Sequence, residues 1–130
     1  MNNRSIANEW FEFAKRDLES AKFLTNMHPI PIEIICYHCQ QSAEKYLKGF
    51  VALNGSSIAK THDLVILNKA CKNYNINFSS IDDECIELVV YGVQVRYPYE
   101  LEVNDQDMRF AIECAEKIQT FLEDTLSKHQ

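Results

Sequence analysis

The sequence predicts an all-α protein, an antiparallel up-and-down bundle of four long helices plus one short helix. Apolar residues recur at steps of three and four along most of the chain, which is the periodicity of helices with one buried face. The chain has only 3 Gly and 3 Pro, too few turn-forming residues for a barrel or sandwich of many short strands. Its 130 residues are the length of one domain, so we expect a single domain over residues 1–130.

The first two predicted helices are the longest periodic segments. Residues 3–26 carry apolar side chains at helical spacing, and two prolines within residues 26–31 then interrupt the pattern. Because proline is well tolerated at the first position of a helix, the second helix is expected to begin near Pro31. It is expected to end at Asn54 and Gly55, a pair that suits the left-handed conformation closing many helices.

The short helix and the last helix have polar residues at their expected starts. Residues 64–74 predict the short helix, which either Thr61 or Asp63 could cap. The last helix is expected to open at Asn104 and to run to Leu126.

The fourth predicted helix lies between these two. Ser79 and Ser80 each precede an aspartate by three residues, which is close to the pattern of a capping box. The apolar residues that follow continue the helical spacing, and Pro98 is expected to end the helix.

The charge and the apolar content of the chain limit its partners and its location. With 13 basic and 19 acidic side chains the formal net charge is −6, which disfavours non-specific coating of nucleic acid, and we expect no DNA partner. No run approaches the ~18 apolar residues of a membrane span, and the N-terminus lacks the apolar core of a signal peptide. We therefore expect a cytoplasmic protein without a membrane partner.

The cysteines and the common enzyme motifs indicate no metal and no cofactor. Cys36 and Cys39 form a C-x-x-C pair, but no second pair or H-x-x-x-H completes the four ligands of a structural zinc site. The five cysteines are an odd number without secretory context, so we interpret them as reduced thiols in the core. Phosphate-binding loops, dinucleotide-binding glycine motifs and hydrolase signatures are absent from the sequence.

A polar stripe on the second predicted helix is the first candidate site. His38, Gln41, Lys45 and Lys48 recur at steps of three and four, so they share one helix face. One interpretation is that this is the solvated face of a long helix. The alternative is a ligand-binding face, with His38 as either a buried structural histidine or a functional group.

Two further segments carry groups that suit an anion or a nucleotide. Lys60 and His62 come just before the short helix, where free backbone amides favour a phosphate, although a simple cap would explain the neighbouring residues. Arg96 and Tyr97 combine a cation with an aromatic ring that can stack on a base, and the alternative is a helix stop whose arginine pairs with an acid.

Four short motifs occur in a fixed order along nearly the whole chain. They are Trp10 and Ala14 with Asp17, Leu18 and Ala21; Tyr37-His38-Cys39-Gln40-Gln41-Ser42-Ala43-Glu44-Lys45-Tyr46-Leu47-Lys48; Lys60-Thr61-His62-Asp63-Leu64; and Arg96-Tyr97-Pro98. In this combination and order they resemble the prokaryotic HEPN domain family.

The resemblance implies an all-α bundle that is commonly a homodimer and is often encoded beside a minimal nucleotidyltransferase in a toxin–antitoxin pair. It also implies association with nucleotides or RNA and, in many members, metal-independent ribonuclease activity through an R-x(4–6)-H motif. In that motif the arginine steadies the phosphate while the histidine moves a proton and the ribose 2′-OH attacks. None of the arginines of this chain is followed by a histidine at that spacing.

Three functions are compatible with the resemblance to the HEPN family and with the absence of the R-x(4–6)-H motif. The first is a HEPN dimer that binds a nucleotide or RNA and docks a nucleotidyltransferase. The second is a ribonuclease toxin in which His38 or His62 works with Arg96 from different helices. The third is a non-catalytic structural or dimerisation module. The first assigns ligand binding to His38, Gln41, Lys45, Lys48, Lys60, His62, Arg96 and Tyr97.

Overall fold

The computed structural model describes residues 2–92 and 102–128, and this part of the chain is all-helical. Its elements are α1 (Asn3–Leu24), α2 (Ile32–Leu53), α3 (Leu64–Lys72), the 3₁₀ helix η1 (Ile76–Ile81), α4 (Asp82–Val89) and α5 (Asp105–Lys128). The prediction of an all-α helical bundle is therefore confirmed.

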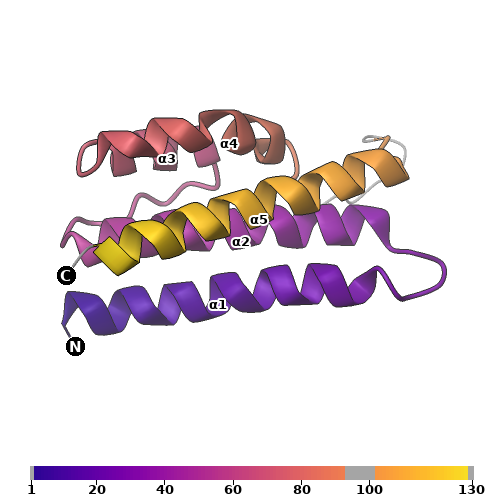
Figure 1. Cartoon of the computed structure of the whole chain (residues 1–130), viewed down its shortest axis with the longest axis horizontal. Helices are drawn as coiled ribbons and strands as arrows, with labels where there is room; N and C mark the ends of the chain where they lie inside the picture. The colour runs from indigo at the N-terminus through magenta and orange to yellow at the C-terminus, as the bar shows by residue number, and fades with distance from the viewer. Residues whose placement is uncertain (1, 93–101, 129–130) are drawn as a thin grey trace.

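The long helices pack around α2. α1 lies antiparallel beside α2, α5 crosses over α2, and α3 and α4 cover the side of α2 away from α1 (Figure 1). α1 begins and α5 ends at the same end of the molecule. Fourteen of the residues of α2 are buried, because this helix contacts α1, α3, α4 and α5.

Small residues let α1 and α2 approach closely. Ala7, Ala14 and Ala21 recur every seven residues on α1, and each is fully buried. On α2, Gly49 lies under the Phe11 ring so tightly that an added Cβ would come within 2.5 Å of it. This close contact fixes α1 beside the polar side of α2.

The helix ends mostly follow the predicted signals. Asp63, rather than Thr61, caps α3, because its carboxylate accepts from the backbone amides of the first turn. Gly55 closes α2 with a φ of +78°, a conformation that strains residues with a Cβ. At the start of α5, Asn104 and Asp107 exchange side-chain and backbone hydrogen bonds of 2.8 and 3.0 Å.

The fourth helix differs from its predicted bounds. α4 ends at Val89, short of the predicted Pro98, which lies outside the described residues. The predicted capping box is also wrong, because Ser79 and Ser80 belong to η1 and no side chain caps α4. The carboxylate of Asp82 instead bonds to two side chains of α3.

All five cysteines are free and buried, which confirms their interpretation as core residues. Burial raises the pKa of the Cys36 thiol to about 12. In the described ranges, no cluster of histidine, cysteine and carboxylate side chains could hold a metal ion. Within the same ranges, no helix is long and apolar enough to cross a membrane.

Candidate functional site

Asp17 of α1 holds two members of the polar stripe on α2. One carboxylate oxygen is 3.0 Å from Nδ1 of His38, and the other pairs with Nζ of Lys45. The Asp17 side chain is 13% exposed, whereas those of His38 and Lys45 are 29% and 24% exposed. The cluster therefore lies at the edge of the α1–α2 interface, with the imidazole partly open to solvent.

Glu44 of α2 forms the second centre and is nearly enclosed. Its side chain is 5% exposed and accepts hydrogen bonds from Lys48 and His62 at 3.0 Å and from Gln40 at 3.1 Å. Burial by itself would raise the pKa of this carboxyl, but the hydrogen bonds from Lys48, Gln40 and His62 outweigh burial, so the pKa lies below its ordinary value. Glu44 is therefore an ionised carboxylate at neutral pH.

His62 ties the connection between α2 and α3 to this centre. Its Nδ1 contacts Glu44, and its backbone carbonyl accepts a 3.1 Å hydrogen bond from the side chain of Gln40. The imidazole nevertheless remains 73% exposed. The same Gln40 amide bonds to Glu44, so one side chain links the connection, the carboxylate and α2.

The start of α3 has fewer free backbone amides for binding an anion than the sequence predicted. The amides of Val65 and Ile66 already donate to the carboxylate of Asp63, and the amide of Asp63 donates to the hydroxyl of Thr61. A phosphate at this corner would have to rely on His62 and on Lys60, which is exposed.

The side chain of Lys48 is nearly buried. Its residue is 8% exposed, and Nζ lies 5.8 Å from the centre of the Trp10 ring as well as 3.0 Å from Glu44. Gln41 donates to the side-chain oxygen of Gln40 at 2.8 Å. The stripe is thus a hydrogen-bonded network along α2, not the solvated helix face that one interpretation of the sequence offered.

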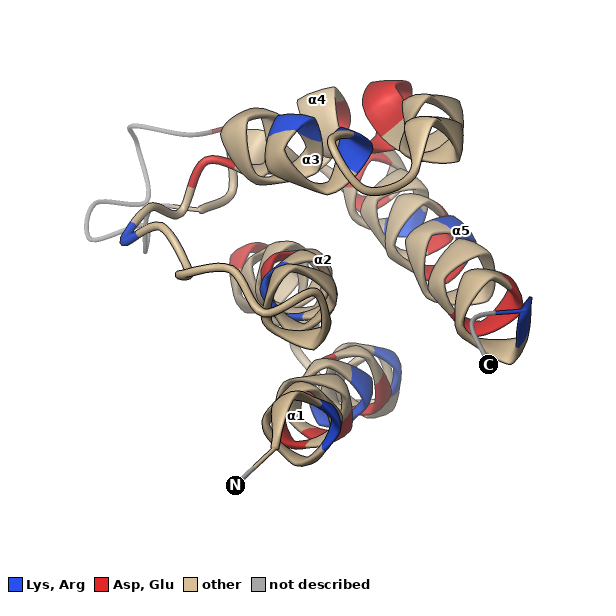
Figure 2. Cartoon of the chain, turned by 90° about the vertical axis from the view of Figure 1, so that its left-hand side faces the viewer, with Lys and Arg blue, Asp and Glu red and all other residues tan. Residues whose placement is uncertain are grey.

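The structure brings most of the predicted site residues together. His38 and Lys45 share Asp17, while Gln41, Lys48 and His62 gather around Glu44. Arg96 and Tyr97 lie outside the described residues. Basic and acidic residues alternate on α1, α2 and α5, so none of these helices presents a purely basic surface (Figure 2).

Sequence reasoning missed the two carboxylates that organise the site. Asp17 is one residue before the buried Leu18 and three after the buried Ala14, so its place beside the apolar stripe of α1 was a usable signal. Glu44 stands four residues after Gln40 and four before Lys48, the spacing of side chains that meet on a helix. Both signals indicate a helix face, but neither indicates which residue of another helix lies opposite that face.

Each imidazole is oriented by a carboxylate through Nδ1. A histidine held in this way donates its Nδ1 proton to the carboxylate and leaves Nε2 to accept or donate a proton. For His38 and His62 the contacts with Asp17 and Glu44 are both 3.0 Å. The arrangement can recognise an anion or move a proton.

Comparisons with known proteins agree with this fold. The family model described as the HEPN domain matches residues 7–125. The chain is also similar to a solved crystal structure of the protein TT1696 from Thermus thermophilus, with a TM-score of 0.76 and 24% identity, over 95% of this chain and 98% of that one. No curated protein matches this chain significantly. Since the HEPN domain match spans nearly the whole sequence, this chain belongs to the HEPN domain family.

Proposed function

We propose that this HEPN domain binds nucleotides or RNA without cleaving them, as a cytoplasmic homodimer that works with a minimal nucleotidyltransferase in a toxin–antitoxin module. The contact of His62 with Glu44 carries the binding part of the proposal, because it brings the connection 54–63 against the polar side of α2. His38, Gln41, Lys45 and Lys48 belong to the same side of that helix. Family membership supports the homodimer and the nucleotidyltransferase partner.

The charges on this side favour a small ligand or an RNA end over a long duplex. Asp17 neutralises Lys45, and Glu44 neutralises Lys48, so these cations already have partners. The exposed Lys60 and the 73% exposed imidazole of His62 are freer to meet a phosphate. With a net charge of −6, the whole chain would repel an extended polyanion.

Fluorescence anisotropy with a labelled single-stranded RNA in chelator tests the binding. We expect the double variant Lys60→Gln/His62→Gln to bind at least ~10-fold more weakly than the wild type, because both groups donate to the phosphate. The matched control is Lys69→Gln, another exposed lysine on the neighbouring α3. RNA binding that is absent from the wild type, or equal in all three proteins, would contradict the proposal.

The two partners need separate measurements. Sedimentation velocity of the purified chain is expected to give twice 15.1 kDa, the mass of a homodimer. Size-exclusion chromatography with a purified minimal nucleotidyltransferase is expected to give a joint peak. Monomer alone in the first experiment, or separate peaks in the second, would remove that part of the proposal.

A ribonuclease is the second candidate, and the carboxylate-held histidines favour it. Many active sites use a carboxylate at Nδ1 to orient an imidazole for proton transfer. In this alternative His62 or His38 moves the proton from the ribose 2′-OH, and Arg96 stabilises the phosphate. The products would be a 2′,3′-cyclic phosphate and a 5′-hydroxyl, formed without a metal.

Cleavage of mixed cellular RNA and tRNA in chelator distinguishes the two functions. The wild type, Arg96→Ala and His62→Ala are compared at equal concentration. Cutting by the wild type that both variants lose would establish the ribonuclease. RNA binding without cutting by any of the three supports the binding protein. If nucleotides also leave the melting temperature of the wild type unchanged, the site has a structural role only.

A further inference from the structure

A hollow of about 530 Å³ lies at the edge of the α1–α2 interface, beside the Asp17 cluster. Its volume falls within the ~300–1,000 Å³ typical of small-molecule sites. It is lined by Arg16, Glu19, Ser20, Phe23, Leu24 and His38.

Arg16 supplies a cation that no described residue neutralises. Its guanidinium carbon lies 5.3 Å from the centre of the Phe13 ring, and in the described part of the chain no carboxylate forms an ion pair with it. The lysines deeper in the interface are different, because Lys45 already pairs with Asp17. A guanidinium held against an aromatic ring remains free to bind a phosphate through two parallel hydrogen bonds.

His38 and Ser20 add polar groups to the same hollow. Asp17 holds Nδ1 of His38, so Nε2 is the nitrogen left for a ligand. When this imidazole is protonated, Nε2 donates to an anion, and the hydroxyl of Ser20 can donate in either state. Three donors from two helices therefore line one small space.

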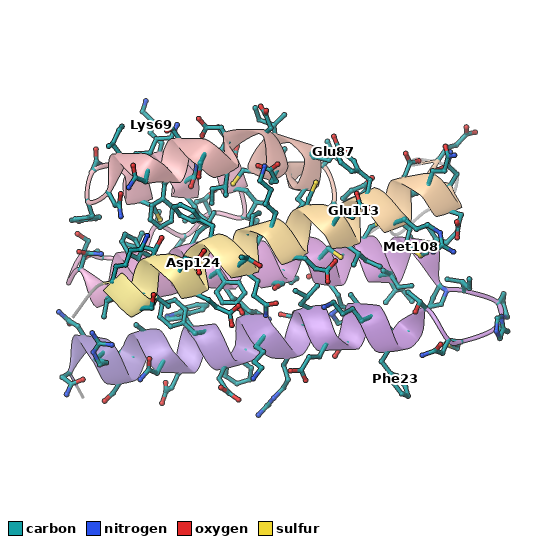
Figure 3. The ribbon with its side chains drawn as sticks, viewed as in Figure 1. Phe23, Lys69, Glu87, Met108, Glu113 and Asp124 are labelled. Carbon is teal, nitrogen blue, oxygen red and sulfur yellow. The ribbon has the colours of Figure 1, made fainter. Side chains whose placement is uncertain are left out.

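Phe23 gives the hollow an aromatic surface. The residue is 76% exposed, the most of the large apolar residues in the described ranges, and it projects from α1 away from the other helices (Figure 3). Leu24 adds an apolar contact beside it. An exposed ring next to a free cation matches a ligand that joins a planar aromatic group to a phosphate.

We propose that this hollow binds a nucleoside monophosphate, with the phosphate against Arg16, Ser20 and His38 and the base against Phe23. Glu19, at the same hollow, can accept hydrogen bonds from ribose hydroxyls. The inference rests on the proposed nucleotide or RNA binding, and it adds a second phosphate site, apart from Lys60 and His62, together with the size of the ligand. A free mononucleotide and the phosphorylated end of an RNA share this chemistry.

An NMR titration of the ¹⁵N-labelled protein tests the site. The probes are AMP, adenosine, inorganic phosphate, and one RNA tetranucleotide with and without a 5′-phosphate. We expect AMP to shift the amide signals of Arg16, Ser20, Phe23 and His38, and to bind at least ~10-fold more tightly than adenosine or phosphate alone. If only the phosphorylated tetranucleotide matches AMP, the ligand is an RNA end, whereas weak binding of both tetranucleotides identifies a free mononucleotide.

Matched variants locate the binding. Arg16→Gln and Phe23→Ala are each expected to weaken AMP binding by about 10-fold. Lys15→Gln and Phe110→Ala remove an exposed lysine of α1 and an exposed phenylalanine of α5 outside the hollow, and both should bind as the wild type does. Retained affinity in Arg16→Gln and Phe23→Ala would overturn this site while leaving nucleotide binding elsewhere intact. An absence of binding by every probe would overturn both the site and the proposed function.

Discussion

Replacing Glu44 by glutamine should destabilise the domain more than any surface substitution, because it breaks a buried ion pair from one side. The Lys48 side chain is 10% exposed and would keep its charge without a partner, while His62 and Gln40 would lose their carboxylate acceptor. Removing one partner of a buried pair costs ~3–5 kcal/mol. Since Lys48 retains some contact with water, we expect about 3 kcal/mol, or roughly 10 °C in Tm for a domain of this size.

Urea unfolding followed by circular dichroism measures this loss directly. The control is Glu123→Gln, which removes an exposed carboxylate from α5 and should change stability by less than ~0.5 kcal/mol. A loss below ~1 kcal/mol for Glu44→Gln would show that the network contributes little to folding, and the reasoning from burial would be wrong.

The stabilisation that Glu44 provides should depend on pH, and the direction of this dependence follows from its pKa. The folded pKa of Glu44 is depressed below its ordinary value of 4.5, so its contribution is fully present above that value and is lost as the pH falls through the folded pKa. The difference between wild type and Glu44→Gln should therefore be largest near pH 7 and should shrink under strong acid. An equal difference at pH 3 and pH 7 would contradict the assigned ionisation.

Three further predictions concern packing, capping and thiol chemistry. Gly49→Val should lower stability by about 1–3 kcal/mol in urea unfolding, because its Cβ would lie 2.5 Å from the Phe11 ring; unchanged stability would mean that the ring moves freely. Asp63→Ala should cost about 1 kcal/mol, from the lost cap on α3, with Asp63→Asn close to wild type. A disulfide reagent at pH 8 should label Cys36 and the other thiols slowly until urea unfolds the chain, because they are buried and the pKa of Cys36 is raised to about 12; rapid labelling of the folded protein would contradict this burial.

The fold was predictable because its strongest signals are local. These signals are the apolar periodicity of α1, α2 and α5 and the caps at Asp63 and Asn104. Each acts within a few residues, so each can be recognised in the sequence alone. The fourth helix was also predicted, but its start was not, because the expected capping box assigned Asp82 to the backbone of the first turn. That carboxylate bonds to Asn68 and Lys72 of α3, and contacts between helices are not visible in a local pattern.

The candidate site was predictable as a helix face but not as a network. The spacing of His38, Gln41, Lys45 and Lys48 correctly places them on one side of α2. Nothing in that spacing shows that Asp17 lies opposite, since it is 21 residues from His38 along the chain. Which cations are neutralised depends on how α1 packs against α2, and the small buried residues Ala14, Ala21 and Gly49 determine how closely the two helices approach.

The distinction between paired and unpaired cations changes where anion binding should be sought. A lysine that already pairs with a buried carboxylate gains little from a phosphate, because binding must first replace a good interaction. Lys45 and Lys48 are of this kind: Lys45 pairs with Asp17 of α1, whereas Lys48 pairs with Glu44 of its own helix. Arg16 and Lys60 have no ion partner among the described residues, so each gains the full interaction with a phosphate. The lysines of the α2 motif are thus already paired, and the nucleotide binding proposed above should depend on the cations Arg16 and Lys60, which the described residues leave unpaired.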